Sequence, residues 1–211
     1  LAASMLLLSR YNHDFELVDP FCGSGTILIE AALIALNIAP GVNREFVCET
    51  WPTMPSNTFD MVREGARNAE KHKDIKLIGY DIDYRTLKVA MENAKKAGVD
   101  KYIQFQKRDF MEFSTSKKYG FVVSNPPYGE RIGEKESLDR LYKHMGYIKE
   151  KLDGWDFNIL TSFEPFEKIF GRKSTKNRKL YNGKIKCYYY QYFDNEKIKN
   201  HGDALINILL K

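Results

Sequence analysis

The sequence predicts an α/β protein with a mostly parallel sheet that ends in an antiparallel pair. Short apolar runs alternate with segments of helical periodicity, which is typical of parallel strands joined by right-handed helical crossovers. A glycine-containing turn, Gly23-Ser24-Gly25, separates the first strand from the first long helix, as in nucleotide-binding α/β folds. Near the end, Asn182-Gly183 is a strong signal for a tight hairpin turn.

The first half of the chain supplies three strands and three helices after an opening helical segment, Leu1–Leu8. The helix after the first strand is rich in Ala, Leu and Ile and stops before Pro40-Gly41. The next helix has Ser56 as its expected N-cap. The third helix closes at Gly98. In chain order these predicted elements are strand Glu16–Val18, helix Thr26–Asn37, helix Ser56–His72, strand Lys76–Tyr80, helix Tyr84–Ala97 and strand Ile103–Lys107.

The second half continues the alternation and then changes. A continuous apolar run, Phe121–Ser124, reads as a buried strand, and a fifth strand follows the next helix. The hairpin signal at Asn182-Gly183 is flanked by Lys179–Tyr181 and Ile185–Phe193. The remaining predicted elements are helix Ser137–Leu152, strand Phe157–Thr161 and helix Glu164–Phe170.

Composition fits one ordinary globular domain of 211 residues, with 43% hydrophobic and 29% charged residues. No apolar run is long enough to span a bilayer, so no membrane partner is expected. Three scattered cysteines form no disulfide or zinc pattern, and four scattered histidines form no metal cluster, which favours a reducing, cytoplasmic location and no metal. The net charge of +5 permits a polyanionic partner. Nothing in the sequence indicates an oligomeric state.

The loop after the first strand is suited to a small charged ligand. Gly23 and Gly25 allow a tight turn and a close backbone approach, and the helix behind them begins with unpaired N–H groups. Leu28 replaces the third glycine of the dinucleotide fingerprint, which therefore is incomplete. The carboxylate of S-adenosylmethionine fits the same amides, with Asp19 placed to pair with its ammonium group. A plain tight turn is the alternative.

Two further carboxylates end neighbouring predicted strands. Asp81 ends the second strand and can accept hydrogen bonds from both ribose hydroxyls. Asp83 is expected to cap the following helix. Asp109 ends the third strand and can bind an adenine amino group, with Phe110 packing against the ring. Because the carboxyl ends of parallel strands share one edge, these groups are expected to line one site.

A second loop, Asn125-Pro126-Pro127-Tyr128, follows the fourth strand and suits an amine. An exocyclic base amine is a poor nucleophile because its lone pair is delocalised into the ring. The side-chain carbonyl of Asn125 and the backbone carbonyl of Pro126 can accept from its two N–H groups, while Tyr128 can stack on the base. Such a base must be unpaired or flipped out. A proline-stiffened turn is the alternative reading, and Arg131 is expected to position the substrate.

Three other segments carry weaker predictions. The basic residues crowded between Arg172 and Lys186 form either a rim that contacts phosphates or a solvated hairpin edge. The aromatic run Tyr188–Phe193 is expected to pack in the core and along the edge of the sheet. Val42–Pro55 is either an ordered insertion beside the substrate cleft or a surface connector. The first is favoured because Phe46 and Trp51 are expected to pack on the sheet edge.

The strings at Asp19–Thr26, Asn125–Arg131 and Lys179–Ile185 together resemble the THUMP-associated RNA guanine-N2 methyltransferases, especially the bacterial large-subunit rRNA group (UPF0020-type). The resemblance implies a Rossmann-like class I methyltransferase fold of seven strands over residues 1–193, a tail over 194–211, and an upstream RNA-binding THUMP domain. It implies S-adenosylmethionine as cofactor and RNA as substrate, with base contacts at Asn125, Pro126 and Tyr128. The implied cofactor contacts are Asp19, Phe21, Gly23, Gly25, Thr26, Asp81, Ile82, Asp109, Phe110 and Asn125.

Several functions compete with methylation of a guanosine N2 amine in 23S rRNA. The same chemistry could act on guanine in tRNA or on the N6 amine of adenine in DNA. A nicotinamide-dependent oxidoreductase is disfavoured by Leu28 and by the second loop. A catalytically silent RNA-binding module is disfavoured by the intact set of site residues.

Overall fold

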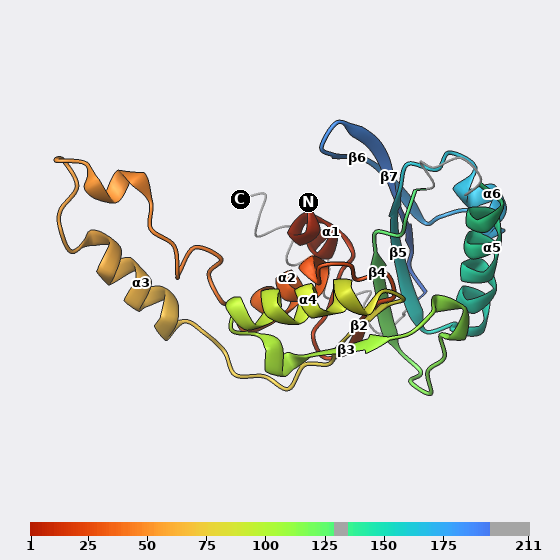
Figure 1. Ribbon diagram of the computed structural model, residues 1–211, viewed down its shortest axis with the longest axis horizontal. Helices are drawn as coiled ribbons and strands as arrows, with labels where there is room; N and C mark the ends of the chain where they lie inside the picture. The colour runs from red at the N-terminus through yellow and green to blue at the C-terminus, as the bar shows by residue number, and fades with distance from the viewer. Residues whose placement is uncertain (129–134, 195–211) are drawn as a thin grey trace.

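Within residues 1–128 and 135–194, the part of the chain that this computed structural model describes, seven strands form one sheet (Figure 1). Their order is β3-β2-β1-β4-β5-β7-β6. Only β7 runs against its neighbours. This confirms the predicted parallel sheet with an antiparallel last strand. The strands are β1 (Glu16–Asp19), β2 (Leu77–Asp81), β3 (Ile103–Lys107), β4 (Gly120–Ser124), β5 (Trp155–Thr161), β6 (Lys176–Asn182) and β7 (Ile185–Tyr192).

The central strands β1, β2 and β4 determine where the loops that follow them lie. β1 pairs in parallel with β2 on one side and with β4 on the other, and Leu17 lies opposite both Leu77 and Phe121. All three of these side chains are buried. Since the strands run in one direction, their last residues, Asp19, Asp81 and Ser124, reach the same edge.

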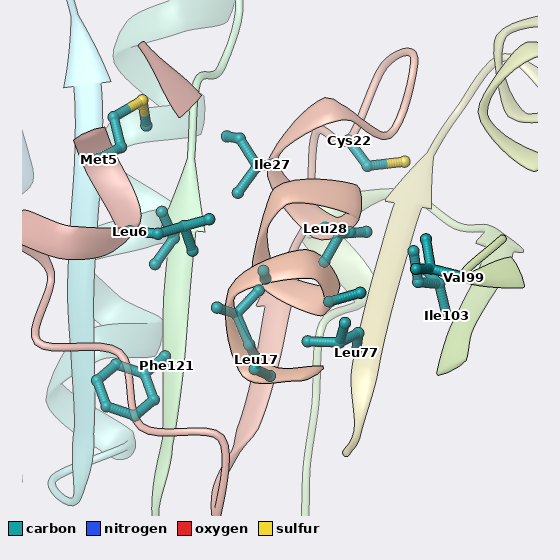
Figure 2. Close-up of a cluster of buried hydrophobic side chains, with 14 of the residues drawn as sticks. Met5, Leu6, Leu17, Cys22, Ile27, Leu28, Leu77, Val99, Ile103 and Phe121 are labelled. Carbon is teal, nitrogen blue, oxygen red and sulfur yellow. The ribbon is translucent and has the colours of Figure 1, made fainter. Parts of the chain in front are cut away.

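One face of the sheet is covered by three helices, α1 (Ala2–Leu8), α2 (Thr26–Leu36) and α4 (Tyr84–Lys96). Figure 2 shows side chains of α1 and α2 filling the space against β1, β2 and β4. α2 is apolar nearly all round because both α1 and α4 flank it, so six of its eleven residues are buried. The labelled side chains in this layer include Met5, Leu6, Leu17, Ile27, Leu28, Leu77 and Phe121.

The opposite face packs on α5 (Lys135–Lys151) and α6 (Phe166–Phe170) through aromatic rings. Phe166 stacks on Tyr190 with ring centroids 4.7 Å apart, and Phe170 stacks on Tyr192 at 4.4 Å. Tyr189 is buried on the other face. The prediction of core packing is therefore confirmed for Tyr189, Tyr190 and Tyr192, while Tyr188 packs at the edge and is only half-buried.

The predicted elements are present, with ends shifted by a few residues, but the segment before β2 differs. Its helix, α3 (Thr58–Asn68), has Asn57 and not Ser56 at the N-cap. Trp51 is 56% exposed, and Phe46 stacks on Phe59 of α3 at 5.9 Å, so the expected packing on the sheet edge is wrong. Phe46 thus finds its apolar partner on α3 and not on the sheet. Figure 1 shows the segment before β2, including α3 (orange), as an arm that stands away from the sheet.

The part of the chain that the structure describes has no helix with the length and apolar character needed to cross a bilayer. The proposed positioning role of Arg131 and the tail beyond Asp194 concern residues outside the described ranges.

Close contact between α5 and α6 gives a test of the packing. A Cβ built on Gly146 of α5 would lie 1.9 Å from the backbone oxygen of Phe170. Because backbone cannot move aside easily, Gly146→Ala is expected to lower the free energy of unfolding by about 1–3 kcal/mol. Gly65→Ala in α3 is the matched control, since a Cβ there meets nothing within 4 Å. Urea unfolding of both variants measures the effect, and equal stabilities would contradict this packing.

Candidate functional site

The loops after β1 and β4 are joined by a buried hydrogen bond. Ser124, the last residue of β4, donates from Oγ to Oδ1 of Asp19 at 2.6 Å. The backbone N–H of Phe21 donates to the same oxygen at 3.2 Å. Asp19 and Ser124 are 1% and 0% exposed. The carboxylate therefore fixes the start of the first loop against the residue that precedes Asn125.

Burial changes the protonation of Asp19. Loss of solvent raises the pKa of its carboxyl to about 7, and the neighbouring charge of Asp81 adds to this rise. The bonds from Ser124 and Phe21 act in the opposite direction. The sequence placed Asp19 against a ligand's ammonium group, whereas the structure directs its carboxyl into the protein.

Two glycines, Gly23 and Gly25, determine the shape of the first loop, which we call the glycine loop. Gly23 and Gly25 both have positive φ, +53° and +80°, which favours glycine. A Cβ on Gly25 would lie 3.1 Å from both the Cβ of Ala90 and the ring of Phe105, so this glycine also allows close packing on α4 and β3. A Cβ on Gly23 meets nothing within 4 Å, so the backbone there stands open to a ligand.

A cavity of about 650 Å³ opens beside this loop at the carboxyl edge of the sheet. Its volume is in the range of sites for small molecules and cofactors. Six residues predicted as cofactor contacts line it: Phe21, Asp81, Ile82, Asp109, Phe110 and Asn125. The other lining residues are Pro20, Met111, Pro127, Ser137, Arg140 and Leu141.

The two carboxylates of the cavity are held by backbone donors. Asp81 accepts from the N–H of Gly23 at 3.2 Å and from the N–H of Asp83 at 2.9 Å, which ties β2 to the first loop. Asp109 accepts from the N–H of Met111 at 2.9 Å and is exposed. Each oxygen retains a free lone pair for a ligand hydroxyl or amine.

Apolar side chains complete the cavity wall. Phe21 packs on Phe110 with ring centroids 5.4 Å apart, while Phe110 itself is 1% exposed. Ile82 is 67% exposed. Thr26 lies outside the lining, and its hydroxyl bonds to that of Ser24 at 3.0 Å. Asp83 caps α4 by accepting from the N–H of Arg85, which confirms the role predicted for it.

The second loop presents Asn125 at the rim of this cavity. The Oδ1 atom of Asn125 accepts a short hydrogen bond from the hydroxyl of Tyr128. A carbonyl oxygen has two lone pairs, so one remains available. Tyr142 of α5 supports the loop from behind by donating to the carbonyl oxygen of Pro127 at 3.1 Å.

The side chains of Pro126 and Tyr128 pack against the protein, which the spacing of the motif did not indicate. Pro126 is buried, and the Tyr128 ring packs against the hydrophobic layer below α1 and α2. The Tyr128 hydroxyl also lies 3.4 Å from Nδ2 of Asn182 and 3.5 Å from Sγ of Cys187. Burial raises the pKa of this hydroxyl above its ordinary value, so Tyr128 stays neutral and can donate to Asn125.

Sequence reasoning missed the contribution of α5. Ser137, Arg140 and Leu141 line the cavity from the first turns of this helix. Their spacing is ordinary for an amphipathic helix, and no sequence signal separates cavity residues from surface residues there. Met111 could have been found, because it follows Asp109 and Phe110 directly.

A seven-stranded sheet in this order, with a glycine loop and carboxylates along its carboxyl edge, defines a Rossmann-like methyltransferase domain. The chain belongs to the UPF0020 family, described as an RMKL-like methyltransferase domain, whose profile matches residues 1–191. This agrees with the resemblance seen in the sequence.

Similar proteins agree on this class. YpsC of Bacillus subtilis (strain 168), provisionally named an RNA methyltransferase, is 47% identical over 92% of the chain. The ribosomal RNA large subunit methyltransferase K/L of Shewanella pealeana is 40% identical over 91% of it. The crystal structure of SMU.472, provisionally named a methyltransferase and complexed with S-adenosylhomocysteine, matches 91% of the chain with 41% identity and a TM-score of 0.88.

The chain is shorter than these relatives. It spans 50% of YpsC, 28% of the K/L protein and 51% of SMU.472.

The buried carboxyl predicts a dependence of stability on pH. A carboxyl whose folded pKa is about 7, against an ordinary value of 3.8, keeps its proton while the unfolded chain loses it. Stability is therefore expected to fall as pH rises from about 4 to about 7, by up to about 4 kcal/mol from this group. Asp19→Asn keeps the acceptor oxygen and removes the titration.

Urea unfolding between pH 4.5 and pH 8 measures this difference. The parent is expected to lose stability relative to Asp19→Asn over that range, while the exposed-site control Asp153→Asn follows the parent. Parallel curves for the parent and Asp19→Asn would show that Asp19 is not protonated in the folded state.

Proposed function

We propose that this chain is the catalytic domain of an S-adenosylmethionine-dependent methyltransferase that modifies the N2 amine of a guanosine in 23S rRNA. The observation that carries the proposal is the position of Asn125, which stands at the rim of a cavity also lined by Phe21, Asp81 and Asp109. A cofactor cavity and an amine-binding carbonyl thus share one opening. The rRNA names of the K/L relatives support the substrate class.

The cavity residues fit S-adenosylmethionine, which supplies the methyl group. Asp81 offers a carboxylate for the ribose hydroxyls, and Asp109 offers one for the adenine amine. Phe21 and Ile82 give apolar walls for the adenine ring. The open backbone at Gly23 and the start of α2 suit the ligand's carboxylate. The S-adenosylhomocysteine bound in SMU.472 supports the choice of cofactor.

Asn125 and Pro126 would act on the amine. Their carbonyl oxygens can accept from its two N–H groups, which holds the nitrogen with its lone pair directed into the cavity. Tyr128 is a positioning residue in this account, because its hydroxyl bonds to Asn125 and fixes the side chain's rotamer. The surplus proton leaves the nitrogen after transfer, so no strong base is needed.

The proposed target base is guanine, with adenine as the second candidate. Guanine is favoured by the resemblance carried by the Asn125–Arg131 and Lys179–Ile185 strings. A 44% identical structure from Listeria monocytogenes carries the name of a predicted N6-adenine-specific DNA methylase, which keeps adenine as the second candidate. We further propose that residues 1–193 form the catalytic domain, that 194–211 form a tail, and that an RNA-binding THUMP domain lies upstream in the whole protein.

Nucleoside mass spectrometry of rRNA, tRNA and DNA from cells with and without the gene tests the target. Loss of N2-methylguanosine from 23S rRNA alone is expected in the deletion strain. Loss of the same nucleoside only from tRNA, or loss of N6-methyladenine from DNA, would replace the proposed substrate with one of the alternatives.

Asn125→Ala tests the amine site. It is expected to lower kcat by about 100- to 1,000-fold, since one preorganised polar group aimed at the reacting atom is removed. The dissociation constant for S-adenosylmethionine, measured by calorimetry, is expected to change little. Asn177→Ala, at an exposed position in β6, is the control. A variant that methylates 23S rRNA at the parental rate would show that Asn125 does not hold the amine.

Asp81→Ala tests the cofactor site. Loss of a charged acceptor is expected to weaken S-adenosylmethionine binding by about 1.5–3 kcal/mol, or roughly 10- to 150-fold in Kd. Asp100→Ala, an exposed carboxylate outside the cavity, serves as the charge-matched control. Equal cofactor affinity in calorimetry of the two variants would remove Asp81 from the site.

A further inference from the structure

The β6–β7 hairpin carries a patch that the proposed catalytic chemistry does not use. Its paired positions put Lys179 opposite Tyr188, and Tyr181 opposite Lys186. Directly paired residues lie on the same face of a sheet, so the four side chains form a square in which Lys and Tyr alternate along both strands and across them. We refer to these four residues as the Lys–Tyr square.

The square is open to solvent. Lys179, Tyr181 and Lys186 are exposed, Tyr181 by 56%, and Tyr188 is half-buried. Each tyrosine ring has one lysine of its own strand above it: Lys179 lies 5.5 Å from the centre of the Tyr181 ring, and Lys186 lies 5.5 Å from that of Tyr188. The rings are thus held at the surface beside a cation.

Charge on this hairpin is one-sided. From Arg172 to Phe193 there are seven basic residues and no acidic residue, although the whole chain is nearly balanced with 33 Lys and Arg against 28 Asp and Glu. In the described residues, Arg172 is paired with Asp194, but no carboxylate lies within ion-pair distance of Lys179, Lys184 or Lys186. These lysines have charge available for an anionic partner.

The hairpin is continuous with the proposed amine site. Asn182, the last residue of β6, contacts the hydroxyl of Tyr128, the residue that orients Asn125. This contact lies on the sheet face of α1 and α2, whereas the square lies on the opposite face, which packs on α5 and α6. The first turns of α5 also line the cavity. β6 is three strands from β4, or about 14 Å at the usual spacing of strands. Figure 1 shows the β6–β7 turn projecting beyond the neighbouring strands.

We propose that the Lys–Tyr square binds the single-stranded RNA segment next to the target nucleotide. Tyr181 and Tyr188 stack on unpaired bases, and Lys179 and Lys186 neutralise adjacent phosphates. Aromatic rings interleaved with cations are the combination that single-stranded nucleic acids require, because every base has a stacking face and every nucleotide carries a charge. Lysines that only protect a sheet edge would need no exposed tyrosine between them.

This inference depends on the proposed RNA substrate and is tested separately from it. Filter binding of unmodified 23S rRNA to the full-length protein is measured over a series of salt concentrations. Lys179→Gln/Lys186→Gln is expected to weaken binding and to reduce the slope of log K against log salt by about 1.4, since each lost phosphate contact contributes about 0.7 for a single strand. Lys117→Gln/Lys118→Gln removes the same charge from the opposite edge of the sheet and is expected to keep the parental slope.

The stacking half is tested with Tyr181→Ala and Tyr181→Phe. The alanine variant is expected to weaken binding by about 5- to 150-fold, and the phenylalanine variant, which keeps the ring, by less than about threefold. Thermal unfolding checks that both variants are folded. Calorimetry with S-adenosylmethionine is expected to give one Kd for all variants, because the square does not line the cavity.

The outcomes separate the two proposals. The role of the square is overturned if both double lysine variants keep the parental slope of log K against log salt, or if Tyr181→Ala binds as tightly as the parent. Neither result would change the proposed target of the enzyme. A parent that neither binds nor methylates 23S rRNA overturns the proposed function and this inference together. Equal loss in Tyr181→Ala and Tyr181→Phe would assign the effect to the hydroxyl and contradict stacking.

Discussion

Parallel pairing of β1 with β4, completed by the hydrogen bond from Ser124 to the buried Asp19, is the constraint on which the site depends. Strand pairing alone brings the two loops to one edge, but it leaves their side chains free to turn. The bond to a carboxyl that is 1% exposed removes that freedom in the last residue of each strand, directly before the loops. The glycine loop and Asn125 therefore take fixed positions relative to each other before any ligand binds.

The rest of the fold supports this edge from both faces. Helices α1, α2 and α4 cover one face, and Ala90 of the amphipathic α4 packs beside Gly25 of the glycine loop. On the other face, α5 reaches the second loop through Tyr142 and lines the cavity through Arg140 and Leu141. Of the strand-end carboxyl groups, Asp19 is buried, while Asp81 and Asp109 line the cavity. The tightly packed sheet and helices hold the carboxyl edge rigid, and the polar groups at that edge are accessible to ligands. A cofactor cavity and an amine site can therefore share a rim.

Strand and loop periodicity, which local sequence encodes, predicted the sheet, the shared edge and the cavity residues Asp81, Asp109, Phe110 and Asn125. Phe21 was expected in the site only from the resemblance to the methyltransferase family. The sequence could not predict where Asp19 and Tyr128 point, since their partners, Ser124 and Cys187, are 105 and 59 residues away. Nor could it place Trp51, because α3 satisfies the apolar contacts of its arm without the sheet.

The shared opening of the cofactor cavity and the amine site can be tested by a crystal structure of the full-length protein with S-adenosylhomocysteine and guanosine monophosphate. We expect the ribose against Asp81, the adenine between Phe21 and Ile82, and the guanine amine at Asn125. The amine nitrogen is expected within about 4 Å of the sulfur, as a near-attack arrangement requires. Binding of the nucleoside at the amino edge of the sheet, near Lys117 and Gly154, or a sulfur turned away from Asn125, would contradict it.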